Sequence, residues 1–306
     1  MQPRYFDLNS YLRQRFGVRV HKLTVDAGLT CPNRDGRVGT GGCIYCNAKG
    51  SGTGAHAHGL SITDQLEAAK IAVARRFKAK KFIAYFQSYS NTYAPLEQLQ
   101  AMYDEALAVD GVVGLAIGTR PDCVDASVLS LLESYTRRTL VWVEYGLQSA
   151  HDVTLARINR GHDAATFRNT VLATAGRGIL ICAHIILGLP GEDADQMRAT
   201  ADYIARLPID GVKLHLLYIV RGTPMEALYH AGAYRCLTQE EYVTLVCDLL
   251  ERLPPHIVIQ RLTGDPHRDE LVAPQWAFAK AQTLNSIQQQ LAFRDTHQGR
   301  LFVPFK

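Results

Sequence analysis

The chain has 306 residues, of which 47% are hydrophobic and 20% are charged. This composition is ordinary for a globular protein and excludes a disordered, collagen-like or coiled-coil chain. The formal net charge of +4 permits a nucleic-acid partner without arguing for one.

The seven cysteines are more informative than the charge. Three of them crowd into one glycine-rich stretch, and the other four, Cys123, Cys182, Cys236 and Cys247, are scattered. The first residues form no apolar run, and the longest apolar stretch, 179–189, is too short to cross a bilayer. We therefore expect a cytoplasmic protein without a membrane contact. Because cytoplasmic thiols stay reduced, clustered cysteines indicate metal binding or catalysis before disulfides.

Apolar, β-rich runs alternate with helical patterns along the chain. The expected strands are 20–25, 82–88, 113–119, 140–148, 180–189 and 212–220, with a possible seventh at 257–262. The expected helices are 63–77, 95–109, 125–135, 164–177, 193–206, 239–252 and 275–292. Strands that are apolar on both faces and joined by helices indicate right-handed βαβ units and a parallel sheet.

This alternation predicts an α/β fold, a partial (β/α)6 barrel related to the eight-fold barrel, with a doubly wound sheet as the alternative. We expect the barrel to span residues 20–220. A short N-terminal extension, 1–19, covers one end, and an α-rich C-terminal extension, 221–306, packs beside the last strand and helps to close the site.

The three clustered cysteines follow the first expected strand. Eleven residues separate Cys31 from Cys43 and two separate Cys43 from Cys46, in a stretch whose glycine, proline and asparagine indicate a loop. Three thiolates leave one position of a four-ligand site open. A zinc ion completed by His56 or His58 fits this pattern, and so does a 4Fe-4S cluster with one free iron, because soft thiolates suit both.

The segment Cys43-Ile44-Tyr45-Cys46 resembles the end of the cluster motif of the radical S-adenosylmethionine (SAM) superfamily. The long first gap is typical of the branch that contains the catalytic subunit of Elongator. The segments at 118–122, 144–149, 159–162 and 188–192, which read GTRPD, EYGLQS, NRGH and GLPGE, resemble that branch too. Within it the chain is similar to the YhcC-type family of bacterial radical SAM proteins, in CPNRDG, GTGGCIYCN, AYFQSYSNT, RINRGHD and QRLTGD.

The resemblance implies that Cys31, Cys43 and Cys46 hold three irons of a 4Fe-4S cluster and that the fourth iron binds SAM. Reductive cleavage of SAM would then give a 5′-deoxyadenosyl radical that abstracts a substrate hydrogen. An electron donor such as flavodoxin or ferredoxin is implied as a partner. The residues implied to contact SAM are Tyr45, Gln87, Ser88, Thr119, Arg120, Glu144, Gln148, Arg160 and His184.

Three of these residues have structural alternatives. Tyr45 can be a plain packing aromatic. Arg120 is two residues from Asp122 and can form a local ion pair with it. Glu144 lies in an apolar strand, where a cation such as Lys213 can make it one half of a buried pair. Gln87 and Ser88 stand where the superfamily usually carries a Gly-Gly-Glu stretch, so the resemblance is weakest there. The sequence assigns no catalytic side chain.

The Elongator-like branch acts at C5 of the wobble uridine of tRNA, so the resemblance implies tRNA as the substrate and a change to that side chain. Two other hypotheses stay open. One is the same radical chemistry on a small metabolite, and the other is a non-catalytic RNA-binding protein stabilised by zinc.

Overall fold

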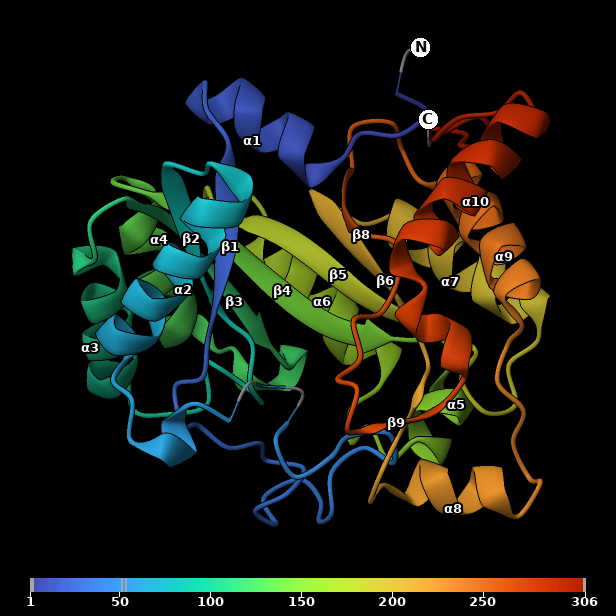
Figure 1. The fold of residues 1–306 in the computed structure, drawn as a ribbon. Coiled ribbons are helices and arrows are strands. Elements are labelled where there is room, and N and C mark those ends of the chain that lie inside the picture. Colours follow the sequence, from blue (N-terminus) through green and yellow to red (C-terminus); the bar gives the residue numbers. More distant parts are fainter. Residues whose placement is uncertain (1–2, 51, 53, 305–306) are drawn as a thin grey trace.

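The computed structural model describes residues 3–50, 52 and 54–304, apart from the side chains of residues 74–77. Its centre is a curled sheet in which seven parallel strands follow the order β1-β2-β3-β4-β5-β6-β8 (Figure 1). The strands of this sheet are β1 (Val20–Val25), β2 (Lys81–Phe86), β3 (Val112–Thr119), β4 (Leu140–Gln148), β5 (Leu180–Leu187), β6 (Gly211–Leu216) and β8 (Val258–Arg261).

Helices surround the curled sheet, most of them on its outer face, with α1 across the amino ends of the strands (Figure 1). In chain order they are α1 (Leu8–Phe16), α2 (Ile62–Phe77), α3 (Leu96–Ala108), α4 (Ala126–Thr136), α5 (Asp152–Arg157), α6 (Ala164–Thr174), α7 (Ala194–Ala205), α8 (Pro224–His230), α9 (Gln239–Arg252) and α10 (Lys280–Phe293). Short 3-10 turns lie at η1 (His56–His58), η2 (Pro121–Cys123) and η3 (Gln275–Phe278). Among the described residues, no helix is both long enough and apolar enough to span a membrane.

Helix α9 shows why these segments become helices. Thr238 caps its first turn, and Glu241 bonds back to the Thr238 backbone in a capping box. Its buried side chains recur at helical spacing, including Tyr242, Val246 and Leu249, and pack into the core.

The predicted partial barrel is confirmed. All six expected strands form, and the possible seventh joins the sheet as β8. The expected strand 212–220 is wrong beyond Leu216, because the chain leaves the sheet there and Ile219–Val220 form β7, which pairs antiparallel with β9 (Leu271–Ala273). Strand β5 also ends two residues before its expected end. The division into 1–19, 20–220 and 221–306 stays a prediction.

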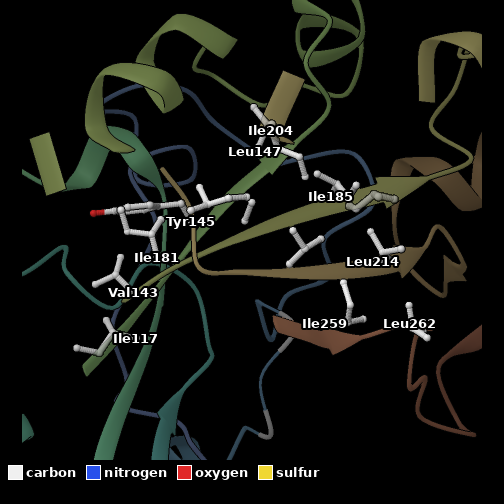
Figure 2. Close-up of a cluster of buried hydrophobic side chains, with 14 of the residues drawn as sticks. Ile117, Val143, Tyr145, Leu147, Ile181, Ile185, Ile204, Leu214, Ile259 and Leu262 are labelled. Atoms are coloured by element: carbon white, nitrogen blue, oxygen red, sulfur yellow. The ribbon is translucent and has the colours of Figure 1, made fainter. Parts of the chain in front are cut away.

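The larger hydrophobic core fills the space between the sheet and the helices. Figure 2 shows part of it, with Ile117, Val143, Tyr145, Ile185 and Leu214 projecting from successive strands. These residues occupy one side of each strand, as the period of two requires. The side chains at the intervening positions therefore face the inside of the barrel.

A smaller core closes the inside of the barrel at the amino ends of the strands. It contains Val20, Trp142, Cys182 and Val258 from the strands and Leu12 from α1. The ring of Tyr11 meets that of Trp142 edge-on, with centroids 5.7 Å apart. Because this end is packed, polar side chains further along the same strands line the open, carboxyl end, where such barrels carry their chemistry.

The sheet does not close on itself: β1 and β8 are its two edges. The segment before α1 lies along β8, where Asp7 bridges Ile259 and the Ile259 amide donates to the Phe6 carbonyl at 2.8 Å. Near the C-terminus, Gln298 binds the same segment, since its side chain accepts from the Phe6 amide at 2.9 Å. Described segments from near both ends of the chain therefore meet beside β8.

Candidate cofactor and substrate site

A cavity of about 210 Å³ opens at the carboxyl ends of the strands, and Cys31, Cys43 and Cys46 all line it. Of the nine residues expected to contact SAM, eight also line it: Tyr45, Gln87, Thr119, Arg120, Glu144, Gln148, Arg160 and His184. The ninth, Ser88, is buried outside the lining, where its hydroxyl lies against Gly52 so closely that no larger residue would fit there.

Side-chain hydrogen bonds hold the loop that carries the cysteines. The fully buried Asn33 donates to the Asn159 carbonyl at 2.5 Å, and Asn159 donates back to the Gly42 carbonyl at 2.8 Å. Arg34 donates to the carbonyls of Cys46 and Asn47 at 2.8 and 2.6 Å. These contacts replace a regular backbone ladder, which a glycine-rich loop lacks.

Arg160 binds the central cysteine of the loop. Its guanidinium donates to Cys43 Sγ at 3.6 Å and to the Gly146 carbonyl at 2.6 Å. Burial raises the pKa of the Cys43 thiol, but the charge and hydrogen bond of Arg160 outweigh it, so the pKa lies below its usual value. For Cys46, burial dominates over the charge of Arg34 and raises the pKa. Arg160 therefore favours the thiolate at Cys43, the form that binds metal.

The donor set fits an iron–sulfur cluster better than the zinc alternative. The three thiols are free and share one cavity, whereas His56 and His58 are exposed on η1 and do not line it. Within the described residues, no three Cys, His, Asp or Glu side chains are already gathered as a metal site. The assignment of Cys31, Cys43 and Cys46 as ligands therefore remains a proposal that rests on their shared cavity and on thiolate chemistry.

The other four cysteines do not line the cavity. Burial, as the main cause, raises the pKa of Cys123 to about 12, of Cys236 to about 11 and of Cys247 to about 12. Cys182 lies inside the barrel, and burial raises its pKa as well. Thiols of this kind are unreactive packing groups at neutral pH.

Arg120 forms the local ion pair that the sequence left open. Its guanidinium donates to the two carboxylate oxygens of Asp122 at 2.9 and 2.8 Å. It also donates to the Arg160 carbonyl at 2.7 Å and so holds the segment that carries Arg160. Arg120 lines the cavity as expected, but its donors are directed to protein atoms.

Glu144 is fully buried and also forms the pair that the sequence left open. One oxygen accepts from Lys22, and the other accepts from Lys213 and, at 2.9 Å, from His184. Burial raises the pKa of this carboxyl, but the two ammonium groups outweigh it and hold the pKa well below its usual range. His184 lies in the middle of β5, which runs on to Leu187.

Gln148 lies at an irregular strand end. The pairing of β4 with β5 shifts between Gly146 and Gln148, and Gln148 has a φ of 76°, in the left-handed region. A Cβ atom at Gly146 would lie 2.5 Å from the Gln148 amide and 2.6 Å from the Arg160 guanidinium. The bulge and the glycine together let both polar groups reach the same cavity wall.

Sequence reasoning missed Tyr85, which lines the cavity, and Lys22, which reaches Glu144 from β1. His215 and Arg261 also line it; the sequence left His215 open between a functional and a structural role and offered Arg261 as one of the basic residues of the C-terminal segment. The available signal was a polar residue at every second position of otherwise apolar strands, as in Lys213 and His215 of β6, which places both on the inner face.

Comparisons with known proteins agree with this geometry. The family model of the radical SAM superfamily matches residues 34–204, and that of the radical SAM C-terminal domain matches residues 209–292. The chain belongs to the radical SAM superfamily.

Within the superfamily, the chain is 42% identical over 301 residues to YtqA of Bacillus subtilis, covering 98% of this chain and 94% of that protein. It is 41% identical over 266 residues to YhcC of Escherichia coli strain K12, covering 87% of this chain and 85% of that protein. The expected YhcC-type family is thereby confirmed.

More distant similarities point to the Elongator-like branch. A tRNA uridine(34) acetyltransferase of Dehalococcoides mccartyi is 29% identical over 157 residues, which is 50% of this chain and 33% of that protein. The solved structure of Methanocaldococcus infernus Elp3 with an N-terminal deletion superposes with a TM-score of 0.68 at 15% identity, covering 91% of this chain and 64% of that one. At this identity the superposition shows a common fold.

Proposed function

We propose that this protein holds a 4Fe-4S cluster on Cys31, Cys43 and Cys46, cleaves SAM reductively, and modifies the C5 side chain of the wobble uridine of tRNA. The observation that carries the proposal is that three free thiols and eight of the nine expected SAM contacts line one cavity at the carboxyl ends of the strands. When bound, the cluster and SAM would supply a 5′-deoxyadenosyl radical that takes a hydrogen atom from the substrate.

The chain's own residues bind and orient these groups. Arg160 keeps a positive charge against Cys43, and Tyr45 lies between two of the thiols in the sequence and lines the same cavity. Asn33 and Arg34 fix the loop, so the thiols are presented from a defined backbone. The apolar core at the opposite end of the barrel fills the space between the amino ends of the strands.

Support for tRNA comes from two sources. The similarity to a tRNA uridine(34) acetyltransferase covers half of the chain. Basic groups of the cysteine loop also meet aromatic rings of the segment after β2, since Arg34 lies 5.7 Å from the Tyr89 ring and Arg37 lies 5.7 Å from the Tyr93 ring, and Arg34 and Tyr89 line the cavity. Such pairs suit RNA phosphates and bases. A flavodoxin or ferredoxin in the cytoplasm would supply the electron.

The cofactor part is tested by anaerobic reconstitution with iron and sulfide. We expect about four irons per chain, and 5′-deoxyadenosine on reduction with SAM. Cys43→Ala should lose both, whereas the matched control Cys247→Ala, in the core, should keep both. A colourless protein that carries one zinc and leaves SAM intact would refute the radical chemistry.

The substrate part needs a separate measurement. Nucleosides from tRNA of a strain that lacks this gene should show a changed wobble-uridine side chain, and a plasmid copy should restore it. A Cys43→Ala copy should not. An unchanged profile combined with intact SAM cleavage in vitro would favour a small metabolite as the substrate.

A further inference from the structure

Below the cysteines, the inside of the barrel carries a layer of charged side chains. Lys22 of β1, Glu144 of β4, Lys213 of β6 and Arg261 of β8 all point into this layer from different strands, and His184 of β5 joins them. The layer therefore contains three basic side chains, those of Lys22, Lys213 and Arg261, together with one histidine and one carboxylate. Buried charges of one sign are costly unless a partner neutralises them.

Glu144 cannot neutralise all of them. Its two oxygens already accept from Lys22, Lys213 and His184. The guanidinium of Arg261 makes no hydrogen bond or ion pair with any residue that the structure describes, although Arg261 lines the cysteine cavity. A half-buried guanidinium whose five donors meet no acceptor among the described residues is well suited to bind a carboxylate or a phosphate.

Burial, and after it the neighbouring cations, lower the pKa values of the basic groups in this layer. Burial is the main cause that lowers the pKa of Lys213 to about 7, and Lys22 and Arg261 lower it further although Glu144 raises it. The pKa of His184 is lowered to about 4, by burial first and then by Lys213, with a smaller effect of Arg261. The pKa of His215 is also lowered, mainly by burial and then by the charge of Arg261. Both histidines are therefore neutral at pH 7.

A second cavity, of about 500 Å³, reaches this layer from the gap between β1 and β8. Lys22, Lys213 and Arg261 line it, and Tyr85 and Arg261 line both cavities. Its carboxylates are engaged elsewhere, since Asp265 pairs with Lys280 at 2.7 Å and Asp7 caps α1. The amide nitrogen of Gln260, also in its lining, is buried without a partner among the described residues.

We propose that Arg261 and Lys213, with Lys22 behind them, form a binding site for an anionic group of the substrate, a carboxylate or a phosphate. Bidentate contact with Arg261 would fix the orientation of the group. An anion held there lies in the wall shared by the two cavities, so the atoms attached to it extend toward the cysteines. The assignment rests on the proposed function only in taking the anion as part of the substrate.

The direct test measures thermal unfolding of the cluster-loaded protein at constant ionic strength, with chloride replaced by acetate or by phosphate. Either anion should raise the unfolding midpoint by about 2–4 °C, because a ligand that binds only the folded state stabilises it. The anion with the larger shift identifies carboxylate or phosphate as the preferred group. No shift with either anion would overturn the proposal.

Variants of Arg261 test whether the anion that raises the unfolding midpoint binds at this residue. Arg261→Met removes no hydrogen bond within the described residues, so it should fold, and it should lose the shift; Arg261→Lys should keep part of it. The matched control is Arg138→Met, an exposed arginine paired with Asp104 outside both cavities. It should keep the whole shift. An equal shift in Arg261→Met would also overturn the proposal.

SAM carries a carboxylate of its own, so its binding is measured separately by equilibrium dialysis. We expect Arg261→Met to change the SAM dissociation constant by less than about twofold. A tenfold weakening would assign the anion to SAM and overturn the substrate assignment. None of these measurements uses tRNA, so a failure of the tRNA hypothesis would leave the anion-dependent shift unchanged.

Discussion

The cysteine loop and the charged layer beneath it line adjoining cavities but are built in different ways. In the loop, chemistry is concentrated in a short stretch of sequence and is held by side-chain bonds from Asn33 and Arg34. In the layer, single residues from five strands meet only because the sheet curls, and the backbone ladder fixes them. Substitutions within one short segment can therefore change the chemistry of the loop, whereas the arrangement of the charged layer depends on how all the strands of the barrel are placed.

The largest effect on stability should come from the layer. Glu144→Gln removes the carboxylate that Lys22 and Lys213 share, so these buried ammonium groups would face each other without compensation. We expect a loss of about 3–5 kcal/mol in the free energy of unfolding, measured by urea denaturation. The control Glu133→Gln breaks a partly exposed pair with Arg177 and should cost no more than about 1 kcal/mol. If Glu144→Gln and Glu133→Gln lost the same free energy of unfolding, the buried layer would contribute no more to stability than an exposed ion pair, and the prediction would be wrong.

The pH dependence of that loss follows from the pKa of Glu144. The folded-state pKa is lowered well below its usual value, so the unfolded state takes up protons first as the pH falls. The stability that Glu144 contributes should be complete above about pH 5, where the carboxyl is ionised in both states. This contribution should decline once the pH falls below the unfolded-state pKa of Glu144, and it should be lost as the pH passes through the folded-state pKa. The difference between wild type and Glu144→Gln in urea unfolding at several pH values checks this, and a difference that grows on acidification contradicts it.

A smaller effect is expected in the loop. Asn33→Ala removes a buried donor to the Asn159 carbonyl and leaves that carbonyl without its partner. We expect about 1–3 kcal/mol of destabilisation and a faster loss of iron to a chelator, because the cysteine loop loses one of its anchors. Thr238→Ala, which removes the cap of α9, is a control of comparable cost, about 1 kcal/mol, that should leave iron retention unchanged.

The smallest effect should come from the outer anchor of the loop. Glu270 accepts from Asn47 at 3.0 Å and from Lys49 at 2.5 Å, and the Lys49 side chain is 56% exposed. Glu270→Gln should leave the unfolding midpoint unchanged, since exposed ion pairs contribute little. Hydrogen exchange should become faster at residues 44–50 and not in α9. If the exchange protection of residues 44–50 equals that of wild type, the hydrogen bonds of Asn33 and Arg34 hold the loop without Glu270.

The sequence predicts the barrel well because buried parallel strands are apolar throughout and stand out from the helical patterns. It also predicts the cysteine loop, since the three thiols are neighbours in the chain. The charged layer was only partly accessible: Glu144 and Lys213 were considered as a pair, but Lys22 and Arg261 were not. Which inward positions of distant strands meet depends on strand stagger and curl, and neither is encoded in the local pattern. The end of β6 and the start of β7 depend in the same way on β9, more than fifty residues later.

The strip of backbone that lies along β8 has a consequence for solubility. A free strand edge exposes amides and carbonyls that invite another chain to add to the sheet, and natural proteins cover such edges. Here the segment around Phe6 and Asp7 occupies the edge of β8, and Gln298 fastens it from the other end of the chain. The segment that covers this edge is thus itself held by a residue almost three hundred positions away in the sequence, which ties the two ends of the chain to the same edge strand.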